Sequence, residues 1–501
     1  MSHLLIAPIL LPALTAVLLV FLARSNLKIT RVISLASALS LLYIAIVFVA
    51  QSSTDTIEVY APGNWAPPFG IVLVADRLSS LMLLVNAVLL VASIIFTFNW
   101  KAERNDNLQP LIHFLAMGVN GAFLTGDLFN LFVFFEVMLI ASYALTIFGG
   151  GKERAKASMH YVILNLVGSS LFIIGVGIVY GMLGTMNMAD LAVKITQVPA
   201  ENAPIMAAAA LTLLLVFGLK AAILPLYFWL PRAYSNAIAP VAALFAIMTK
   251  VGIYSIIRVH GMIFSQQPIA GLIEPWLWPI ALLTIVTGSI GMLGAKRVRM
   301  QIAYAIIVSV GTMIAGVAIN TAEAIQAAVY YLIHSTWITA ALFLLTEVIA
   351  QQRGNMSDSI VRGPQIRQHT ALSIYFFVAA IALVGMPPLS GFIGKLLLLK
   401  VTPGGAAQAW LWTIILVSSL AIIIALGRTG STLFWRVTDL KDSKPEVAIS
   451  SWLSISGLML VTIGLVVFAE SALVYLADLG VQIMDPASYI HAVFSMEVIT
   501  Q

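Results

Sequence analysis

The sequence predicts an all-α polytopic membrane protein with about fourteen transmembrane helices. Of its 501 residues, 61% are hydrophobic and only 9% are charged, whereas soluble domains carry about 25% charged residues. The apolar residues also fall into blocks of about 20, the length of helix that crosses a bilayer. A soluble chain this apolar would expose large apolar patches and aggregate. We therefore treat 1–501 as a single membrane domain and count its spans.

The expected spans are the apolar blocks between loop signals. They cover 3–23, 30–50, 72–98, 109–126, 128–148, 159–183, 205–230, 239–262, 276–295, 300–320, 323–350, 370–399, 408–434 and 449–477. The weakest division lies between 109 and 148, where only Gly126-Asp127 marks a turn. We group the spans as N-terminal helices 1–3 in 1–108, two five-helix units in 109–262 and 276–434, and a C-terminal helix 14 with its tail in 449–501.

Basic residues test this count through the positive-inside rule, which places loops rich in Lys and Arg in the cytoplasm. The odd-numbered loops hold 19 of the 26 basic residues, and the even-numbered loops hold only Lys194 and Lys400. One missed or additional span would scramble this asymmetry. We therefore expect a multi-pass protein of the cell inner (plasma) membrane, with cytoplasmic odd loops and both termini outside.

The composition also excludes several classes of function. The chain has no cysteine, so disulfides, thiolate metal sites and cysteine-ligated Fe–S clusters are excluded. It has no Walker motif, Rossmann glycine pattern or bis-histidine haem geometry, so we expect no cofactor. A net charge of +5 without a polybasic tail does not suggest nucleic acid. Energy must come from an ion gradient or from partner subunits, as in a secondary transporter rather than an enzyme.

Lys220 lies about fifteen residues into the span 205–230, near the middle of the bilayer. A charged residue there costs at least about 2.5–3.5 kcal/mol and marks an ion pathway or a proton relay by default. Pro225 follows and breaks the backbone hydrogen-bond ladder. A broken helix at membrane depth is tolerated only where it is buried in protein or lines a wet cavity. The alternative is an inert lysine that caps the freed carbonyls.

Lys395 has a similar setting in the twelfth span. Pro387 and Pro388 interrupt that span, and Lys395 opens its second half. A plain kink would need no lysine. However, Lys395 is close to the expected outer end, with Lys400 beyond it, so a lysine that snorkels to the interface is the alternative.

The two broken helices, each with a lysine, lie 175 residues apart. Corresponding interruptions in two halves of a chain are typical of inverted-repeat transporters. Helices 4–8 and 9–13 each hold five spans, so the second unit starts with the opposite orientation, as an inverted repeat requires. We therefore expect two inverted five-helix repeats with helices 7 and 12 discontinuous.

Glu136 lies in the middle of the span 128–148 among aromatic residues. A lone carboxylate in this setting would be neutral, whereas one beside a lysine can stay charged. Lys220 belongs to the same five-helix unit and is its natural partner. Such a pair would act as a switch that an arriving proton weakens. The alternative is a structural glutamate that bonds to the backbone.

Lys250 and His334 lie in the middle of spans 239–262 and 323–350. Two lysines, Lys220 and Lys250, cannot both be comfortably charged in a dry site, so together they suit the passage of one proton between amines. Histidine titrates near neutrality and suits a relay between lysines. The alternative for His334 is a hydrogen-bonded core histidine.

Other ionisable residues are expected at membrane interfaces. Arg77 is expected to pair locally with Asp76, and Arg258 to snorkel from the outer end of its helix. Glu347 and four histidines have the same interfacial interpretation. These are His113, His160, His260 and His369.

Taken together, these residues carry a family resemblance over essentially the whole chain. The motifs are Phe135-Glu136; Gly218-Leu219-Lys220-Ala221-Ala222 with Pro225; Thr249-Lys250; Tyr331-Leu332-Ile333-His334-Ser335; and Pro387-Pro388-Leu389-Ser390-Gly391-Phe392 with Lys395. The set resembles the antiporter-like subunits shared by respiratory complex I and the multisubunit Mrp cation/proton antiporters. The loop Gly63-Asn64-Trp65-Ala66-Pro67-Pro68-Phe69-Gly70 and the segment Leu230-Pro231-Arg232-Ala233-Tyr234-Ser235-Asn236-Ala237 resemble the D-type Mrp subunits most.

The resemblance implies a role for each buried residue. Glu136 and Lys220 would form a coupling ion pair, Lys250 and His334 a central relay, and Lys395 an outer exit gate. It also implies that the chain works in a hetero-oligomeric complex in the membrane and carries protons in exchange for Na+. The nearest alternative is a proton-pumping subunit of a redox-driven complex such as complex I or a membrane hydrogenase. A passive membrane scaffold is the third possibility.

Overall fold

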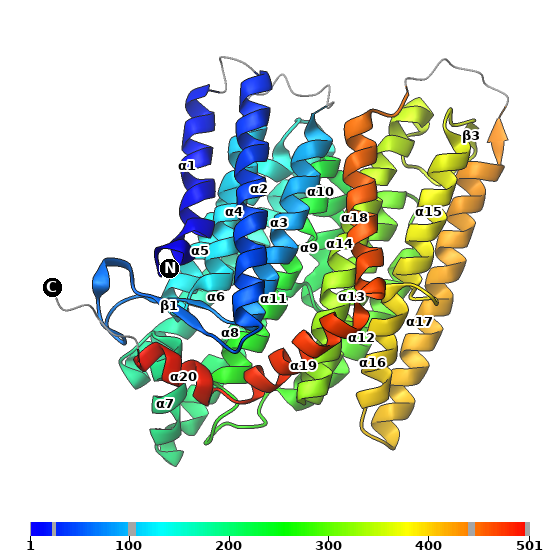
Figure 1. The fold of residues 1–501 in the computed structure, drawn as a ribbon. Coiled ribbons are helices and arrows are strands. Elements are labelled where there is room, and N and C mark those ends of the chain that lie inside the picture. Colours follow the sequence, from blue (N-terminus) through cyan, green and yellow to red (C-terminus); the bar gives the residue numbers. More distant parts are fainter. Residues whose placement is uncertain (1, 23–26, 99–106, 439–445, 496–501) are drawn as a thin grey trace.

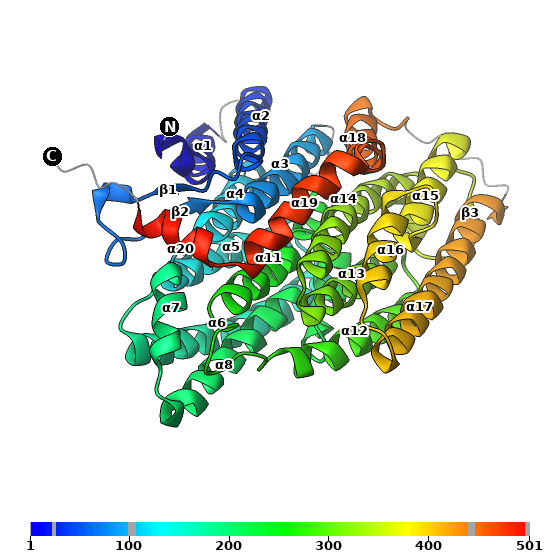
Figure 2. The same ribbon diagram turned by 60° about the horizontal axis from the view of Figure 1, so that its bottom comes forward.

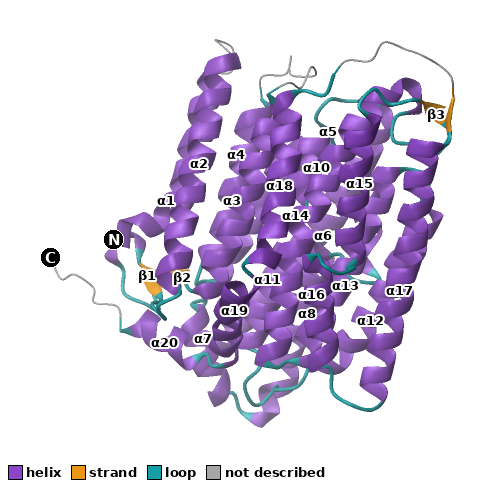
Figure 3. Ribbon diagram, turned by 45° about the vertical axis from the view of Figure 1, so that its right-hand side comes forward, coloured by secondary structure: helices purple, strands orange, loops and turns teal. Residues whose placement is uncertain are grey.

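A computed structural model of the chain describes residues 2–22, 27–98, 107–438 and 446–495. Within these residues twelve helices are long and apolar enough to cross a membrane, and two shorter apolar helices, Leu108–Leu124 and His369–Val384, complete the set. These fourteen elements correspond one to one with the expected spans. Figure 3 shows how completely helices dominate the bundle, with only short strands at its ends. The prediction of an all-α polytopic membrane protein is confirmed.

The N-terminal part holds three of the spans. Its elements are η1 (Ser2–Ile6), α1 (Ala7–Leu22), α2 (Leu27–Ser52), β1 (Glu58–Tyr60), η2 (Pro62–Asn64), β2 (Leu73–Ala75) and α3 (Arg77–Thr97). β1 and β2 form an antiparallel hairpin that the sequence did not predict. β2 occupies the start of the expected third span. α3 begins only after Asp76, and Asp76 and Ser79 together cap its first turn.

Five spans follow in the next part of the chain. They contain α4 (Leu108–Leu124), α5 (Leu128–Ile147), α6 (Lys152–Leu183), α7 (Met188–Lys194), η3 (Ile195–Gln197), η4 (Ala200–Asn202), α8 (Ala203–Ala221), η5 (Leu226–Phe228), α9 (Trp229–Asn236), α10 (Ala239–Phe245), α11 (Met248–Ser255) and η6 (Ile256–His260). The seventh span is discontinuous, as expected. It leaves the helix at Ala222, which has a left-handed φ of 62°, and resumes beyond Pro225.

The remaining spans complete the bundle. They contain α12 (Glu274–Gly294), α13 (Val298–Ile319), α14 (Ala322–Arg353), η7 (Gly354–Met356), β3 (Gly363–Pro364), α15 (His369–Val384), α16 (Ser390–Val401), α17 (Ala406–Gly430), η8 (Ser431–Trp435), β4 (Val437–Thr438), α18 (Ile449–Val467), α19 (Ala469–Met484) and α20 (Ala487–Phe494). The twelfth span is also discontinuous: α15 ends at Val384, Gly385 follows it with φ of 83°, and α16 starts at Ser390.

The eighth span departs from the expected continuous helix. It consists of α10, a turn, α11 and the π-helical turn η6. No proline lies inside it beyond its first turn, so the break has no local signal in the sequence. Beyond the turn, Gly252 of α11 packs so closely on broken α8 that a Cβ would lie 2.5 Å from the Ala221 backbone nitrogen.

The fourteenth span is shorter than the expected 449–477. α18 ends at Val467, and α19 turns away and crosses the lower end of the bundle in Figures 1 and 2. α19 packs on α14 and α3, and α20 continues to α7 and β1. The reason is chemical: α19 carries Glu470, Asp478 and Gln482, and such a segment is more stable across the end of the bundle than inside lipid.

The loops alternate between two ends of the bundle, as the span count requires. At one end, Arg154 bonds to the Asn236 carbonyl, Arg297 pairs with Asp358, and β3 pairs with β4. These contacts join odd-numbered loops only. At the other end, backbone bridges join Leu73 to Thr125 and Asp127 to Asn187, which belong to even-numbered loops. Five of the basic residues counted in the odd loops lie outside the described residues: Arg24, Lys101, Arg104, Lys441 and Lys444.

Candidate functional site

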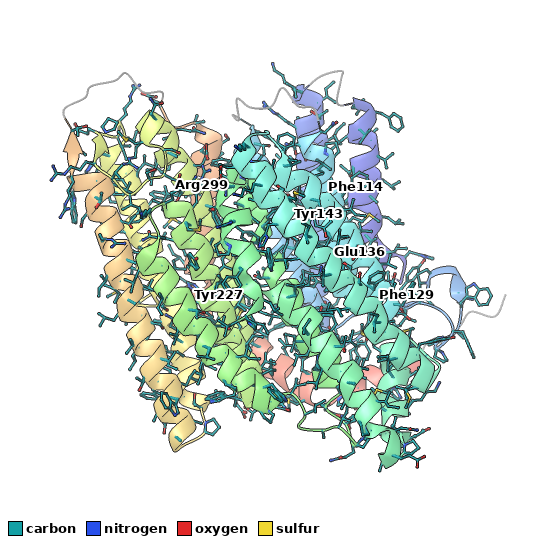
Figure 4. All side chains as sticks on the ribbon, turned by 180° about the vertical axis from the view of Figure 1, so that it is seen from behind. Phe114, Phe129, Glu136, Tyr143, Tyr227 and Arg299 are labelled. Atoms are coloured by element: carbon teal, nitrogen blue, oxygen red, sulfur yellow. The ribbon has the colours of Figure 1, made fainter. Side chains whose placement is uncertain are left out.

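Glu136 lies midway along α5 and is half-buried. Figure 4 shows it between Phe129 and Tyr143 on the same helix. Its carboxylate accepts a short hydrogen bond from Ser169 Oγ of α6. The partner is thus a side chain rather than the backbone group of the alternative interpretation.

Lys220 lies one residue before the end of α8 and is buried. Its Nζ donates to Asn165 Oδ1 of α6 at 3.0 Å and lies 5.9 Å from the centre of the Phe135 ring. It does not cap the break that follows it. Trp229 Nε1 donates to the Leu219 carbonyl there, and Thr284 Oγ1 accepts from the Leu224 backbone nitrogen.

The direct ion pair between Glu136 and Lys220 is not formed in this structure: the ion pairs of the described residues do not include it. The reason is the position of α6, which packs on both α5 and α8. Ser169 and Asn165 are four residues apart on α6 and therefore share one face. On this face Ser169 bonds to Glu136, and Asn165 bonds to Lys220.

Lys250 is fully buried on α11. Its Nζ makes no hydrogen bond to any other described residue. The neighbouring Thr249 hydroxyl is also buried without such a partner. Burying an ammonium group without a protein partner costs free energy. We therefore expect a functional reason for a lysine at this position.

His334 is fully buried near the middle of α14. Its Nδ1 and Ser390 Oγ are hydrogen-bonded at 2.8 Å, and Ser390 also donates to the Thr462 carbonyl. Its Nε2 has no hydrogen-bond partner among the described residues. A Cβ on Gly391 would lie 2.7 Å from that nitrogen, so the glycine lets the first turn of α16 approach the ring.

Lys395 is buried on α16 and does not reach an interface. Its Nζ donates to the Val384 carbonyl at 2.7 Å, the last residue of α15, and to Ser419 Oγ of α17 at 2.9 Å. The snorkelling alternative is therefore wrong. The kink allows Lys395 to turn inward, because Gly385 leaves room where a Cβ would lie 3.0 Å from its Cδ.

These side chains lie on elements that pack in succession. α5 packs on α6, α6 on α8, and α8 on α11. α13 packs on both α11 and α14, and α14 packs on α16. In Figure 1 the labels α5, α8, α11, α14 and α16 run across the bundle from left to right. The arrangement is a row of buried polar groups that runs from one edge of the bundle to the other.

The ion pairs of two arginines were not expected from the sequence. Arg258 is buried rather than snorkelling, and pairs with Asp76 at 2.6 Å. Arg77 pairs not with its neighbour but with Asp55 and Asp478. Burial alone would raise the pKa of Asp76, but Arg258 and the hydrogen bonds from Arg258 and Ser79 outweigh it and hold that pKa below its ordinary value.

Glu347, His113 and His260, for which the sequence predicts interfacial positions, are all buried within the protein, and their depth in the membrane stays a prediction. Glu347 forms a close ion pair with Arg299 at the odd-loop end of the bundle. His113 bonds with Ser34, and His260 with the Ala210 carbonyl. Their positions near helix ends did not reveal their burial, because the helices that cover them come from distant parts of the chain. Within the described residues no group of three His, Asp or Glu side chains could hold a metal ion.

Comparison with known proteins shows which family the chain belongs to. Residues 125–425 match the family described as "NADH:quinone oxidoreductase/Mrp antiporter, TM". The chain is 40% identical over 440 residues to the D-type subunit of a Na(+)/H(+) antiporter of Bacillus subtilis (strain 168), and the match covers 87% of each chain. The chain belongs to the NADH:quinone oxidoreductase/Mrp antiporter family.

Further relatives extend over nearly its whole length. The chain is 36% identical to a protein of Rhizobium meliloti (strain 1021) described as the D-type subunit of a probable K(+)/H(+) antiporter, over 99% of this chain and 98% of that one. The fold is similar to a chain in the Mrp complex from Dietzia sp. DQ12-45-1b, with a TM-score of 0.85, 27% identity and coverage of 99% and 100%. It is similar to a chain in an archaeal membrane-bound sulfane sulfur reductase too, with a TM-score of 0.89, 26% identity and coverage of 98% and 100%.

The resemblance seen in the sequence is therefore confirmed at the level of the family and of its D-type subunits. Proteins of this kind are subunits of larger membrane assemblies, as the two structural neighbours are. The family match covers the five site residues from Glu136 to Lys395, but no comparison assigns a role to any of them.

Proposed function

We propose that this chain is the D-type subunit of a multisubunit monovalent cation/proton antiporter and carries protons through the membrane. The observation that carries the proposal is the row of buried polar groups on packed helices, from Glu136 on α5 to Lys395 on α16. Charged residues inside a membrane are rare and mark ion pathways. The relatives named as Na(+)/H(+) and K(+)/H(+) antiporter subunits support the reaction class, and we propose Na+ as the exchanged cation.

The proposed path begins at Glu136. A proton released from this carboxylate passes by way of the hydroxyl of Ser169 and water toward Lys220, whose amine is held by Asn165 Oδ1. Hydroxyl groups and water can both accept and donate hydrogen bonds along such a chain. Glu136 and Lys220 then influence one another through α6 rather than through direct contact.

The second part of the path uses Lys250, His334 and Lys395. Lys250 is a carrier because no described residue holds its amine. His334 has one nitrogen anchored on Ser390 and the other free of protein partners, which suits transfer at Nε2. Lys395 sits in the break of the twelfth span, where the freed Val384 carbonyl binds its amine. We place the exit at this break.

Orientation follows from the charges. Because the odd loops carry most of the basic residues, we propose that they face the cytoplasm of a bacterial-type plasma membrane and that both termini face outside. A role in a redox-driven complex is the second candidate, supported by the similarity to the sulfane sulfur reductase chain. The higher identity to antiporter subunits over most of the chain favours the antiporter.

Everted vesicles that contain the assembled complex test the proposal. We expect Glu136→Gln and Lys220→Met each to reduce cation-dependent proton exchange by at least about tenfold, because removing a proton-transfer group costs on the order of 100-fold or more. The exposed residues Glu153 and Lys156 provide matched controls, Glu153→Gln and Lys156→Met. Wild-type exchange in both site variants, with the complex assembled, would support the passive scaffold instead.

A further inference from the structure

A cavity of about 650 Å³ opens between α6 and α9 on one side and α12 and α13 on the other. His160 of α6, Tyr227 of η5 and Arg232 of α9 line one side of it, and Lys296 and Tyr304 line the other. Its volume is within the range of cavities that hold a small organic ligand. None of its lining residues is acidic.

The charges in this cavity are uncompensated. The side chains of Arg232 and Lys296 are exposed, and the ion pairs of the described residues include neither of them. The neighbouring Arg297 differs, because it is paired with Asp358. Two unpaired cations, a histidine and two tyrosines lining one cavity are complementary to an anion with several acceptor oxygens, such as a phosphate group.

The position of the cavity along the membrane helices indicates which class of phosphate compound it binds. Lys296 lies in the connection between α12 and α13, at the end of the bundle where the odd loops meet. Beside the cavity, apolar side chains are exposed on the outer faces of both helices: Met159 and Ile163 on α6, and Ile290 on α12. Phe228, which lines the cavity, is 59% exposed.

A ligand here therefore meets cations at the end of the membrane helices and apolar surface along their length. We propose that this cavity is a binding site for an anionic phospholipid, with the phosphate on Arg232 and Lys296 and the acyl chains along α6 and α12. Basic pockets between membrane helices at the cytoplasmic side suit such headgroups. None of the five residues of the proposed proton path lines this cavity, so the lipid site can be tested independently of the proposed function.

The packing of α12 keeps the cavity open. Gly291 brings the Tyr304 ring directly against α12, because any Cβ there would collide with the ring. Gly294 lines the cavity and faces open space, since a Cβ there would meet no atom within 4 Å. Gly294→Leu would therefore narrow the cavity without disturbing its walls or its charges.

Photocrosslinking tests the site in the assembled complex. The complex would carry Phe228→p-benzoylphenylalanine and be reconstituted in phosphatidylcholine vesicles that contain cardiolipin, and mass spectrometry would detect the lipid adduct on this chain. We expect Arg232→Gln with Lys296→Gln to reduce the adduct by about fivefold for each cation removed. Gly294→Leu should reduce the adduct about as much as the double substitution does. The control pair, Arg362→Gln with Arg436→Gln, removes two exposed cations at the same end outside the cavity and should leave the adduct unchanged.

Four results would overturn the proposal. An equal loss in the control pair would show a general effect of surface charge, and an undiminished adduct in Gly294→Leu would show that the lipid lies elsewhere. Suppression of the adduct by inorganic phosphate would identify the site as one for small free anions. An adduct with another subunit of the complex in place of lipid would show that a protein covers this face.

Discussion

At the scale of single residues, the sequence identified the buried ionisable groups but not the partners that hold them. Glu136, Lys220, Lys250 and His334 could be identified because a charged or titratable residue inside an apolar span is conspicuous. Ser169 and Asn165 could not, because isolated polar residues in membrane helices usually join helices together. Their spacing of four residues on α6 was the available signal, and it becomes informative only once α5 and α8 are known to flank that face.

Lys395 combines two roles, one of which, the capping of a freed carbonyl, the sequence presented only as an alternative for Lys220. It satisfies the Val384 carbonyl at the break, and it remains a buried amine at the end of the proposed path. We expect Lys395→Met to reduce exchange by at least about tenfold, because the last proton-transfer group is lost. Everted vesicles provide the measurement, with assembly checked on a native gel.

The control for this variant lies on the same helix. Lys400 is exposed five residues further along α16, so Lys400→Met removes the same charge from the interface. We expect it to exchange at the wild-type rate. Equal effects of the two substitutions would assign Lys395 a general electrostatic role and would remove it from the path.

At the scale of elements, the two proline breaks could be predicted, whereas the irregular eighth span could not. Pro225 and the pair Pro387-Pro388 interrupt the hydrogen-bond ladder wherever they occur in a helix. The turn between α10 and α11 has no such local cause. Beyond the turn, Gly252 allows the backbones of α11 and α8 to meet, and only the tertiary structure reveals that contact.

The short turn before α5 gives this helix a pH-dependent cap. Asp127 caps α5 by accepting from the Asn130 backbone nitrogen at 2.7 Å, and it is buried. Burial raises the pKa of Asp127 to about 6. Because the folded state therefore binds the proton more tightly than the unfolded state, this carboxyl costs stability as the pH rises from about 4 to about 6, by about 3 kcal/mol in total.

Asp127→Asn should remove this cost and retain the cap, because asparagine is an equally good N-cap residue. We expect the variant to melt at the wild-type temperature near pH 4 and at a higher temperature than wild type above about pH 6. Thermal unfolding of the purified chain in detergent across this pH range measures the difference. Parallel melting curves for the two proteins at every pH would contradict the assignment.

At the scale of the whole molecule, the alternation of loops was predictable from charge alone. The contacts among odd loops at one end and among even loops at the other agree with fourteen spans. The course of α19 across the even-loop end was not predicted, since its apolar residues extend the last hydrophobic block. The division into two inverted repeats, 109–262 and 276–434, stays a prediction, as does the position of both termini outside.

The central claim concerns the row of buried groups as a whole, and Lys250 tests it most directly. It is the middle member, fully buried, with no described residue bound to its amine. Purified complex would be reconstituted in vesicles, and proton flux driven by a cation gradient would be followed with a pH-sensitive dye.

We expect Lys250→Met to assemble normally, because it removes a costly buried charge and retains the volume of the side chain. Its proton flux should fall to about a tenth of the wild-type value or less, because the relay loses its central carrier. Lys156→Met, at an exposed position on α6, should keep the wild-type flux. Wild-type proton flux in the assembled Lys250→Met complex would contradict the account, since protons would then cross this membrane by another route.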